Sequence, residues 1–365
     1  MDEPRWDSLQ DAQLMIGLLE YDRAEGLLRG ALRDADAAGD DTKASLALEA
    51  LGTIATRRGR EAAARDLLLE AVARGGTPDP AERTQLYFDL ARVHSGLGDA
   101  DAAIAVLEDA LDRVGDDGDL AVRARLGIAL SYACSDAGDY ARTGVILADL
   151  VRSGAEDLDA TTRGSINFAL ARLAAMTGHG AHAIAYTRRS VEVYRELGDD
   201  YGTANALLVH AYCLLDDGQT EEAARSLQES RRLFGPRPSA VDLGFQLVEE
   251  ARCELQCGDW DSAQARAREA VELLGDLSVP GQLGLAYLVL ARTYDEQRED
   301  DRADRAYLAS IDLLLRQNGW LRELAKAYRW YGKFLRRSGR PEAAMEALEQ
   351  ASDLSLRARQ AVGDA

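Results

Sequence analysis

Residues 251–263 read ARCELQCGDWDSA, and this stretch holds the three positions that decide the fold. Ala251 lies seven residues before Gly258, and a second small residue, Ala263, lies five residues after it. The same pattern returns at glycines spaced by 39 or 40 residues, with one final gap of 81: Gly59, Gly98, Gly138, Gly178, Gly218, Gly258 and Gly339. The register extends back to Leu19 and passes through Arg298, so the sequence consists of repeated units.

Columns of small side chains accompany these turn positions. Seven residues before each turn stand Ala12, Gly52, Ala91, Ser131, Ala171, Ala211, Ala251, Ala291 and Gly332. Five residues after stand Ala24, Ala64, Ala103, Thr143, Ala183, Ala223, Ala263, Ala303 and Ala344. A third column, twelve residues after each turn, is small except at Leu150. Antiparallel helices approach to about 8–10 Å only where the contact residues are small, and a left-handed glycine ends the first helix. The sequence therefore predicts an all-α chain of about nine antiparallel helix pairs.

An acidic and then an aromatic residue often follow the turn glycine, as in residues 138–140 (Gly-Asp-Tyr) and 258–260 (Gly-Asp-Trp). Together with the small columns, this pattern resembles the tetratricopeptide repeat over residues 5–358. The period near 40 exceeds the usual unit of about 34 residues, and is similar to the repeats of kinesin light chains and of bacterial peptide-pheromone receptors and regulators. The resemblance implies a right-handed α-solenoid superhelix whose concave groove binds protein or peptide.

Two irregularities interrupt the repeats. The proline-rich segment 234–239 (Phe-Gly-Pro-Arg-Pro-Ser) either bends the solenoid or is simply a longer loop. We expect repeats 1–6 in residues 5–235 and repeats 7–9 with a C-terminal cap in residues 238–358, as one continuous solenoid. At Arg298 the turn lacks its glycine, and a looser turn is expected there.

The composition limits the class of protein. The formal charge is -20, so non-specific binding to nucleic acid or to an anionic membrane is not expected. The chain has no apolar stretch of about 18 residues and no export signal at its amino terminus. Four cysteines without zinc-finger spacing fit a reducing compartment. We therefore expect a cytoplasmic protein, and the Ala, Leu, Asp and Gly bias is typical of GC-rich bacteria.

Little in the sequence indicates chemistry. Cys213, Cys253 and Cys257 either form a thiolate cluster or, in the case of the 213/253 column, fill the interior as small apolar residues. His179 and His182 share one turn with no carboxylate or thiolate beside them. No set of nucleophile, base and acid is present, nor a phosphate-binding loop. We expect no enzymatic activity, no catalytic residue, no cofactor and no metal site.

The face that this family turns towards its groove carries arginine, aromatic and amide side chains. The candidate ligand-binding residues are Phe88, Arg92, Arg125, Tyr132, Phe168, Arg172, Asn205, Tyr212, Phe245, Arg252 and Arg292. Arginine offers forked donors for carboxylates, and aromatic rings offer rigid contact area. The pattern predicts a groove for a protein or peptide with acidic and apolar groups. In the alternative, which can hold at the same time, the arginines pair within the chain with Asp136, Asp216 or Glu254.

The last helix pair is strongly basic on one face. This face is either a solvated cap or a docking face for an acidic partner, an adjoining domain or nucleic acid, of which nucleic acid is the weakest candidate. Its residues are Lys326, Arg329, Lys333, Arg336 and Arg337.

Three functions follow from these patterns. The first is a non-enzymatic scaffold that binds protein or peptide. The second is a ligand-sensing regulatory module whose effector domain is not in this chain. The third is a homo-oligomeric structural scaffold, and the sequence leaves the oligomeric state open.

Overall fold

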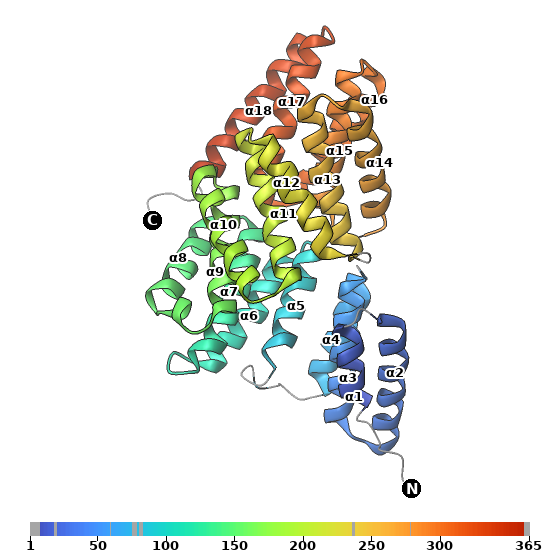
Figure 1. Ribbon diagram of the computed structural model, residues 1–365, viewed down its shortest axis with the longest axis vertical. Helices are drawn as coiled ribbons and strands as arrows, with labels where there is room; N and C mark the ends of the chain where they lie inside the picture. The colour runs from blue at the N-terminus through green and yellow to red at the C-terminus, as the bar shows by residue number, and fades with distance from the viewer. Residues whose placement is uncertain are drawn as a thin grey trace. The chain divides into compact units, whose positions relative to one another are not determined.

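The computed structural model describes residues 8–17, 20–58, 60–74, 79, 83–235, 238–277 and 279–360, and within them it contains helices and no strand (Figure 1). The all-α prediction is confirmed, because the α-helices of these residues form nine successive pairs. In chain order they are α1 (Ser8–Gly17), α2 (Tyr21–Ala38), α3 (Asp41–Arg57), α4 (Glu61–Arg74), α5 (Thr84–Gly96), α6 (Ala100–Val114), α7 (Leu120–Ala137), α8 (Tyr140–Arg152), α9 (Ala160–Met176), α10 (Gly180–Glu196), α11 (Asp200–Asp217), α12 (Thr220–Phe234), α13 (Ala240–Cys257), α14 (Trp260–Gly275), α15 (Pro280–Glu296), α16 (Asp300–Leu315), α17 (Leu321–Arg337) and α18 (Pro341–Gln360). Short 3₁₀ turns, η1 (Ala155–Asp157) and η2 (Asn318–Trp320), precede α9 and α17.

The chain divides into two compact units, Met1–Ala129 and Leu130–Ala365, each of which is described by itself. Buried side chains of α1–α5 form the core of the first unit, around Leu28, Leu48 and Leu86. The largest apolar cluster of the second unit runs from α13 to α18. The expected repeat blocks 5–235 and 238–358, with a bend at 234–239, stay a prediction, because Pro236 and Arg237 lie outside the described residues, as does the start at residue 5.

The glycine–aspartate signature has a direct structural role. Gly98, Gly138 and Gly258 have φ near +81°, the left-handed conformation that ends a helix. The aspartate that follows each of them accepts a hydrogen bond from a backbone N–H in the first turn of the next helix: Asp99 from Ala102, Asp139 from Arg142 and Asp259 from Ser262. One dipeptide therefore ends the first helix of a pair and caps the second.

The small columns lie at the contacts between paired helices. Every residue seven positions before or five positions after a turn is buried, and Ala24, Ala64, Ala223 and Ala263 are fully inaccessible. A β-carbon on Gly52 would lie 2.6 Å from the side chain of Leu68, so the backbone there is too close for a larger residue. The predicted reason for the columns, close helix approach, is confirmed.

Serines in the third column add hydrogen bonds to this packing. Ser190, Ser230 and Ser310 donate to backbone carbonyls of the preceding helix, with distances of 3.1, 2.9 and 2.8 Å. Each bond spans 26 residues and joins the second helix of a pair to the first. Serine at this position therefore gives small size together with a satisfied hydroxyl.

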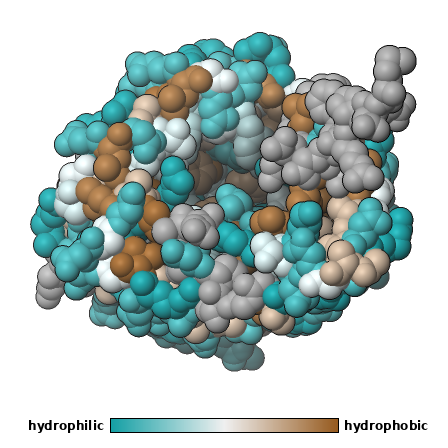
Figure 2. Space-filling model, turned by 90° about the horizontal axis from the view of Figure 1, so that it is seen from below, coloured by the Kyte–Doolittle hydropathy of each residue, from teal (hydrophilic) through white to brown (hydrophobic). Residues whose placement is uncertain are grey.

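Apolar residues on the surface are scattered. On the face shown in Figure 2, hydrophilic residues predominate and hydrophobic residues form separate patches. Leu14, Leu315 and Met345 are among the large apolar side chains that remain exposed. In the described part of the chain, no helix is both long and apolar enough to span a bilayer.

The turn at Arg298 is not looser than the others, so this expectation is wrong. Arg298 takes φ 63°, the one positive φ among non-glycine residues of the described chain. The flanking N–H groups of Arg298 and Glu299 bond to Asp295 and Tyr294 as in the glycine turns. The hydrogen bonds of the neighbouring helices thus hold an arginine in a conformation that costs roughly 1–2 kcal/mol.

We expect Arg298→Gly to raise the free energy of unfolding by about 1 kcal/mol, because glycine adopts this conformation without the steric cost. Gly258→Ala is the matched control. No atom lies within 4 Å of the added β-carbon, so it should lose about as much through backbone conformation alone. Urea unfolding of both variants measures the two effects, and equal stability of Arg298→Gly and wild type would contradict the assignment of strain.

Candidate functional site

The first helices of successive pairs form an inner layer in the second unit. Helix α11 contacts both α9 and α13, and α15 contacts both α13 and α17 (Figure 1). Among the described residues, the second helices do not form comparable contacts with one another. The side chains six residues before each turn therefore lie along this layer, where those of neighbouring pairs meet.

Arginine and tyrosine of this column pack on one another in the second unit. The guanidinium carbon of Arg172 lies 5.0 Å from the ring centroid of Tyr132, and Arg172 pairs with Asp136 at 3.2 Å. Eighty residues after Arg172, Arg252 repeats this arrangement: its guanidinium carbon lies 5.0 Å from the ring centroid of Tyr212, and it pairs with Asp216 at 2.6 Å. In both cases the tyrosine stands 40 residues and the aspartate 36 residues before the arginine. The alternative of internal pairing is confirmed for Asp136 and Asp216.

Internal pairing with Glu254 does not occur at this column. The carboxylate of Glu254 accepts instead from Arg266 on α14. Phe168 contributes to the Tyr132 contact, with its ring edge-on to the tyrosine at a centroid distance of 6.4 Å.

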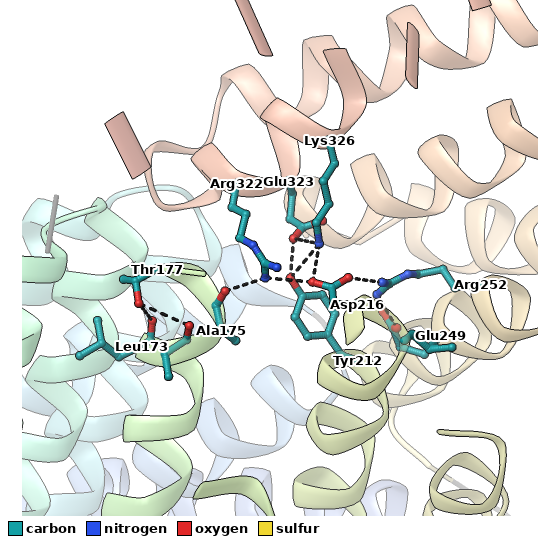
Figure 3. A network of polar contacts seen from close by, with 12 residues as sticks. Leu173, Ala175, Thr177, Tyr212, Asp216, Glu249, Arg252, Arg322, Glu323 and Lys326 are labelled. Atoms are coloured by element: carbon teal, nitrogen blue, oxygen red, sulfur yellow. Dashed lines mark hydrogen bonds and ion pairs between the residues drawn. The ribbon is translucent and has the colours of Figure 1, made fainter. Parts of the chain in front are cut away.

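The first two turns of α17 contact residues more than 100 positions earlier in the chain. The hydroxyl of Tyr212 donates to the carboxylate of Glu323, and Lys326 Nζ lies 2.6 Å from a carboxylate oxygen of Asp216. Figure 3 shows these side chains pointing towards one another, with Arg322 reaching the Ala175 carbonyl at 2.7 Å. The middle of the predicted groove is therefore occupied by the chain's own α17.

The 3₁₀ turn before α17 strengthens this contact. The hydroxyl of the buried Tyr140 donates to the Gly319 carbonyl at 2.7 Å. A β-carbon on Gly319 would lie 2.3 Å from the Ser135 carbonyl oxygen, and one on Gly138 would lie 2.8 Å from the Asn318 carbonyl oxygen. Two glycines thus allow the backbone before α17 to lie directly against the α7–α8 turn.

We call the side chains held at this contact the buried charge network: Tyr212, Asp216, Glu249, Arg252, Arg322, Glu323 and Lys326. Asp216 is at its centre, with Arg252, Lys326 and Arg322 at 2.6, 2.6 and 2.9 Å. Burial opposes ionisation of Asp216, but the three cations outweigh it and hold its pKa well below the usual range. Asp216 is therefore the ionised carboxylate that holds α11, α13 and α17 together.

Glu249 is the least satisfied member of the buried charge network. It is fully buried and pairs with Arg252 at 2.6 Å, while its Oε1 has no hydrogen-bond partner among the described residues. Burial raises the pKa of Glu249 to about 7, and the nearby Arg252 offsets only part of this effect. Glu249 therefore titrates near neutral pH.

A polar cavity of about 260 Å³ lies beside this network. Gly178 and Gly180 line it from the α9–α10 turn, and Asp216, Asp217 and Arg322 contribute the charged groups. The absence of side chains on the two glycines leaves the space open on that side.

The other candidate groove residues are placed differently. In the first unit Arg125 and Arg92 are exposed, and Arg92 lies 3.3 Å from Asp89; Phe88 is half-buried. In the second unit Asn205 donates to the Tyr201 carbonyl, and Phe245 packs against the apolar clusters of α11 and α13–α15. Arg292 lies over the ring of Trp330.

The basic face of α17 is divided between internal and exposed positions. Lys326 belongs to the buried charge network, and Arg337 pairs with Asp295 and Asp300 at 2.6 and 2.7 Å. Arg329, Lys333 and Arg336 remain exposed. Sequence reasoning missed Arg322 and Glu323. The repeat pattern does not mark either position as a contact of α11.

Three of the four cysteines and His210 are packed inside the helix pairs. Cys134, Cys213 and Cys253 are buried, and burial raises the pKa of Cys213 to about 12 and of Cys253 to about 11. His210 is buried beside the Thr187 hydroxyl at 2.7 Å. In the described part of the chain, no three His, Cys, Asp or Glu side chains are grouped so as to hold a metal ion.

Repeated helix pairs, their small columns and the inner layer define an α-helical repeat protein. The tetratricopeptide repeat family model matches residues 84–113 and 325–356, which lie in α5–α6 and α17–α18. With the all-α fold, these matches support a tetratricopeptide-repeat protein.

Solved structures show the same fold. The apo form of RapI is 11% identical, with a TM-score of 0.56 over 75% of this chain and 97% of its own. A Rap protein complexed with Competence and Sporulation Factor is 12% identical, with a TM-score of 0.54 over 97% of this chain and 98% of its own. A Signal Transduction ATPase with Numerous Domains from Pyrococcus horikoshii, which has a tetratricopeptide repeat sensor, is 13% identical, with a TM-score of 0.51 over 92% of this chain and 52% of its own. A comparison with curated protein sequences finds no match.

We expect Glu249→Gln to change how stability depends on pH. The folded state binds the Glu249 proton more tightly than the unfolded chain does, since the pKa rises from 4.5 to about 7. The resulting stabilisation is complete below about pH 4.5 and is lost as the pH rises through about 7. From about pH 5 to 8, the free energy of unfolding of the wild type should fall by about 1–3 kcal/mol relative to the variant. Parallel pH profiles for the two proteins in urea unfolding would contradict the assignment.

Asp216→Asn tests the centre of the buried charge network. The substitution leaves Arg252, Arg322 and Lys326 without their shared carboxylate, and we expect a loss of about 3–5 kcal/mol. Asp312→Asn, at an exposed pair with Arg316, is the control and should cost less than about 1 kcal/mol. Equal unfolding midpoints for the two variants would mean that the network does not hold α17 in place.

Proposed function

We propose that this protein is a non-enzymatic scaffold whose inner layer binds peptide segments of partner proteins. The observation that carries the proposal is the row of arginine and aromatic side chains along the first helices. Several members of that row, including Arg92 and Arg125, remain exposed. Arginine and aromatic residues are enriched where protein interfaces gain most of their binding energy.

The internal contacts of this row support a binding surface that is rigid before the ligand arrives. Arg172 is held by Tyr132 and Asp136, and its side chain keeps 28% of its accessible surface. A side chain that is already ordered loses little conformational entropy on binding. We propose that Tyr132, Phe168, Arg172, Tyr212 and Arg252 form the floor of the surface in the second unit. In the first unit, we propose that the exposed Arg92 and Arg125 are the ligand contacts.

The fold of this chain matches nearly the full length of a Rap protein whose structure contains Competence and Sporulation Factor. This similarity concerns the fold, and it supports the proposal because the same helical scaffold can hold a bound factor. The ligand proposed for this chain is a protein or peptide with acidic and apolar groups, in keeping with the arginines and the rings.

A sensor module of a larger regulator is the second candidate function. The chain matches about half of a signal-transduction ATPase whose tetratricopeptide repeats are called a sensor. Inspection of the adjoining reading frames tests this candidate, since it requires a DNA-binding or nucleotide-binding domain encoded with or beside the chain.

The peptide-binding function is tested by panning the full-length protein against randomised twelve-residue peptides displayed on phage. We expect enriched peptides that bind with micromolar affinity in fluorescence anisotropy. Two variants test whether the row is the binding surface: the double variant Arg92→Ala with Arg125→Ala, and the single variant Arg172→Ala. At least one of them should weaken binding about fivefold or more.

The double variant Arg29→Ala with Arg65→Ala is the matched control, because it removes the same charge from second helices of the first unit, where Arg29 is exposed and Arg65 is half-buried. Enriched peptides whose affinity none of these variants changes would exclude the inner row as the binding surface. Panning without enrichment, beside a control domain that succeeds, would exclude peptide binding.

A further inference from the structure

Arg292 breaks the pairing rule of the inner layer. Arg172 and Arg252 each stack on a tyrosine 40 residues earlier and pair with an aspartate 36 residues earlier. For Arg292, these two positions are occupied by Arg252 and Gln256, so the preceding pair offers neither ring nor carboxylate. The amide of Gln256 donates instead to the Leu215 carbonyl.

The surroundings of Arg292 leave its charge uncompensated. Its Nε is buried and has no hydrogen-bond partner, and no carboxylate pairs with it among the described residues. Burial lowers the pKa of Arg292, although Tyr307 nearby acts in the opposite direction. A guanidinium carries five donors, and a buried donor without an acceptor is costly. The structure of this chain alone therefore does not account for Arg292.

Trp330 brings a second unpaired cation to the same place. The guanidinium carbon of Arg292 lies 3.9 Å from the centroid of the Trp330 ring, and Lys333 Nζ lies 4.1 Å from it. Lys333 is exposed, and within the described chain it forms no ion pair. The ring attracts both cations but neutralises neither, since a cation–π contact contributes only about 0.5–2 kcal/mol and accepts no hydrogen bond.

Among the described residues, the neighbouring acids form no ion pair with Arg292. Glu296, one turn later on α15, and Asp295 only oppose the lowering of its pKa. Asp295 pairs with Arg337, and Asp304 pairs with Arg340 at 2.7 Å. Arg329 and Arg336 lie four residues before and three residues after Lys333 on α17, and both are exposed. A chain with a formal charge of -20 therefore has a local cluster of unmatched positive charge at this point.

We infer that Arg292, Trp330 and Lys333 form an anchor for a carboxylate side chain of an acidic peptide segment in a partner protein. The inference rests on the proposed peptide-binding function and adds the place and the charge of the contact. The carboxylate accepts from the guanidinium of Arg292 and from the ammonium of Lys333, both of which lie about 4 Å from the centroid of the Trp330 ring. Arg329 and Arg336 extend the positive surface for further acidic residues of the segment.

The test observes Trp330 directly. The full-length protein is labelled with 5-fluorotryptophan, its Trp330 resonance is assigned with Trp330→Phe, and ¹⁹F spectra are recorded during titration. The probe is a blocked twelve-residue peptide in which Glu alternates with Leu and Phe, and its counterpart carries Gln in place of Glu. We expect the Glu peptide to shift the Trp330 resonance and to bind at least tenfold more tightly than the Gln peptide.

Arg292→Gln with Lys333→Gln should weaken binding of the Glu peptide at least tenfold. The control, Arg302→Gln with Arg316→Gln, removes the same charge from exposed positions and should change the affinity less than twofold. The unfolding midpoint of the Arg292 and Lys333 variant should equal or exceed that of the wild type, because an uncompensated charge is removed. A lower midpoint with unchanged peptide affinity would show a structural role and would overturn the inference.

Two further outcomes would also overturn it. One is a Trp330 resonance that the Glu peptide leaves unchanged, and the other is equal binding of a single-stranded oligonucleotide of the same charge. Neither of these two outcomes would contradict the proposed peptide-binding function, because that function is tested separately by enrichment from the unbiased peptide library. If that library enriches peptides that do not depend on Arg292 and Lys333, the protein binds peptides at another place.

Discussion

The close approach of paired helices at alanine, glycine and serine is the constraint on which the rest of this structure depends. The residues seven positions before and five positions after each turn are buried in every pair, so any larger side chain there would separate the helices. A fixed distance within pairs keeps the first helices in register, as their contacts from α9 to α17 show. That register places Arg172 and Arg252 over the tyrosines 40 residues earlier.

The local fold could be predicted because a repeat determines the contacts between neighbours. The glycine period and the small columns were sufficient to predict the helix pairs, their buried face and the burial of Cys213 and Cys253. The contact of α17 with α11 could not be predicted, since it depends on small rotations that accumulate over several pairs. The hydrogen bond from Tyr212 to Glu323 spans 111 residues, and no periodic signal marks Glu323 as its acceptor.

The sequence predicted correctly which helices carry the candidate site residues, but it predicted less well which of these side chains are exposed. The column of arginine and tyrosine does lie on the first helices, but Tyr212 is buried and Arg252 is almost so. The sequence carried a signal for this in Asp136 and Asp216, each four residues after a tyrosine of the column. Both aspartates now have arginine partners. Arg322 and Lys326 then complete the charges around Asp216, and only the folded chain brings them there.

One pairing rule therefore explains why the charges around Asp216 are satisfied within the chain and why those around Arg292 are not. Where tyrosine and aspartate precede an arginine at 40 and 36 residues, the charge is satisfied inside the chain and stabilises the packing of neighbouring pairs. Arg292 instead has arginine and glutamine at these positions. Its guanidinium lies over the Trp330 ring, and its Nε has no hydrogen-bond acceptor among the described residues. A buried network of opposite charges tolerates little displacement. The buried charge network therefore gives the helices that carry Arg292 and Trp330 a rigid support. Binding at Arg292 then needs no rearrangement of the helices that carry it.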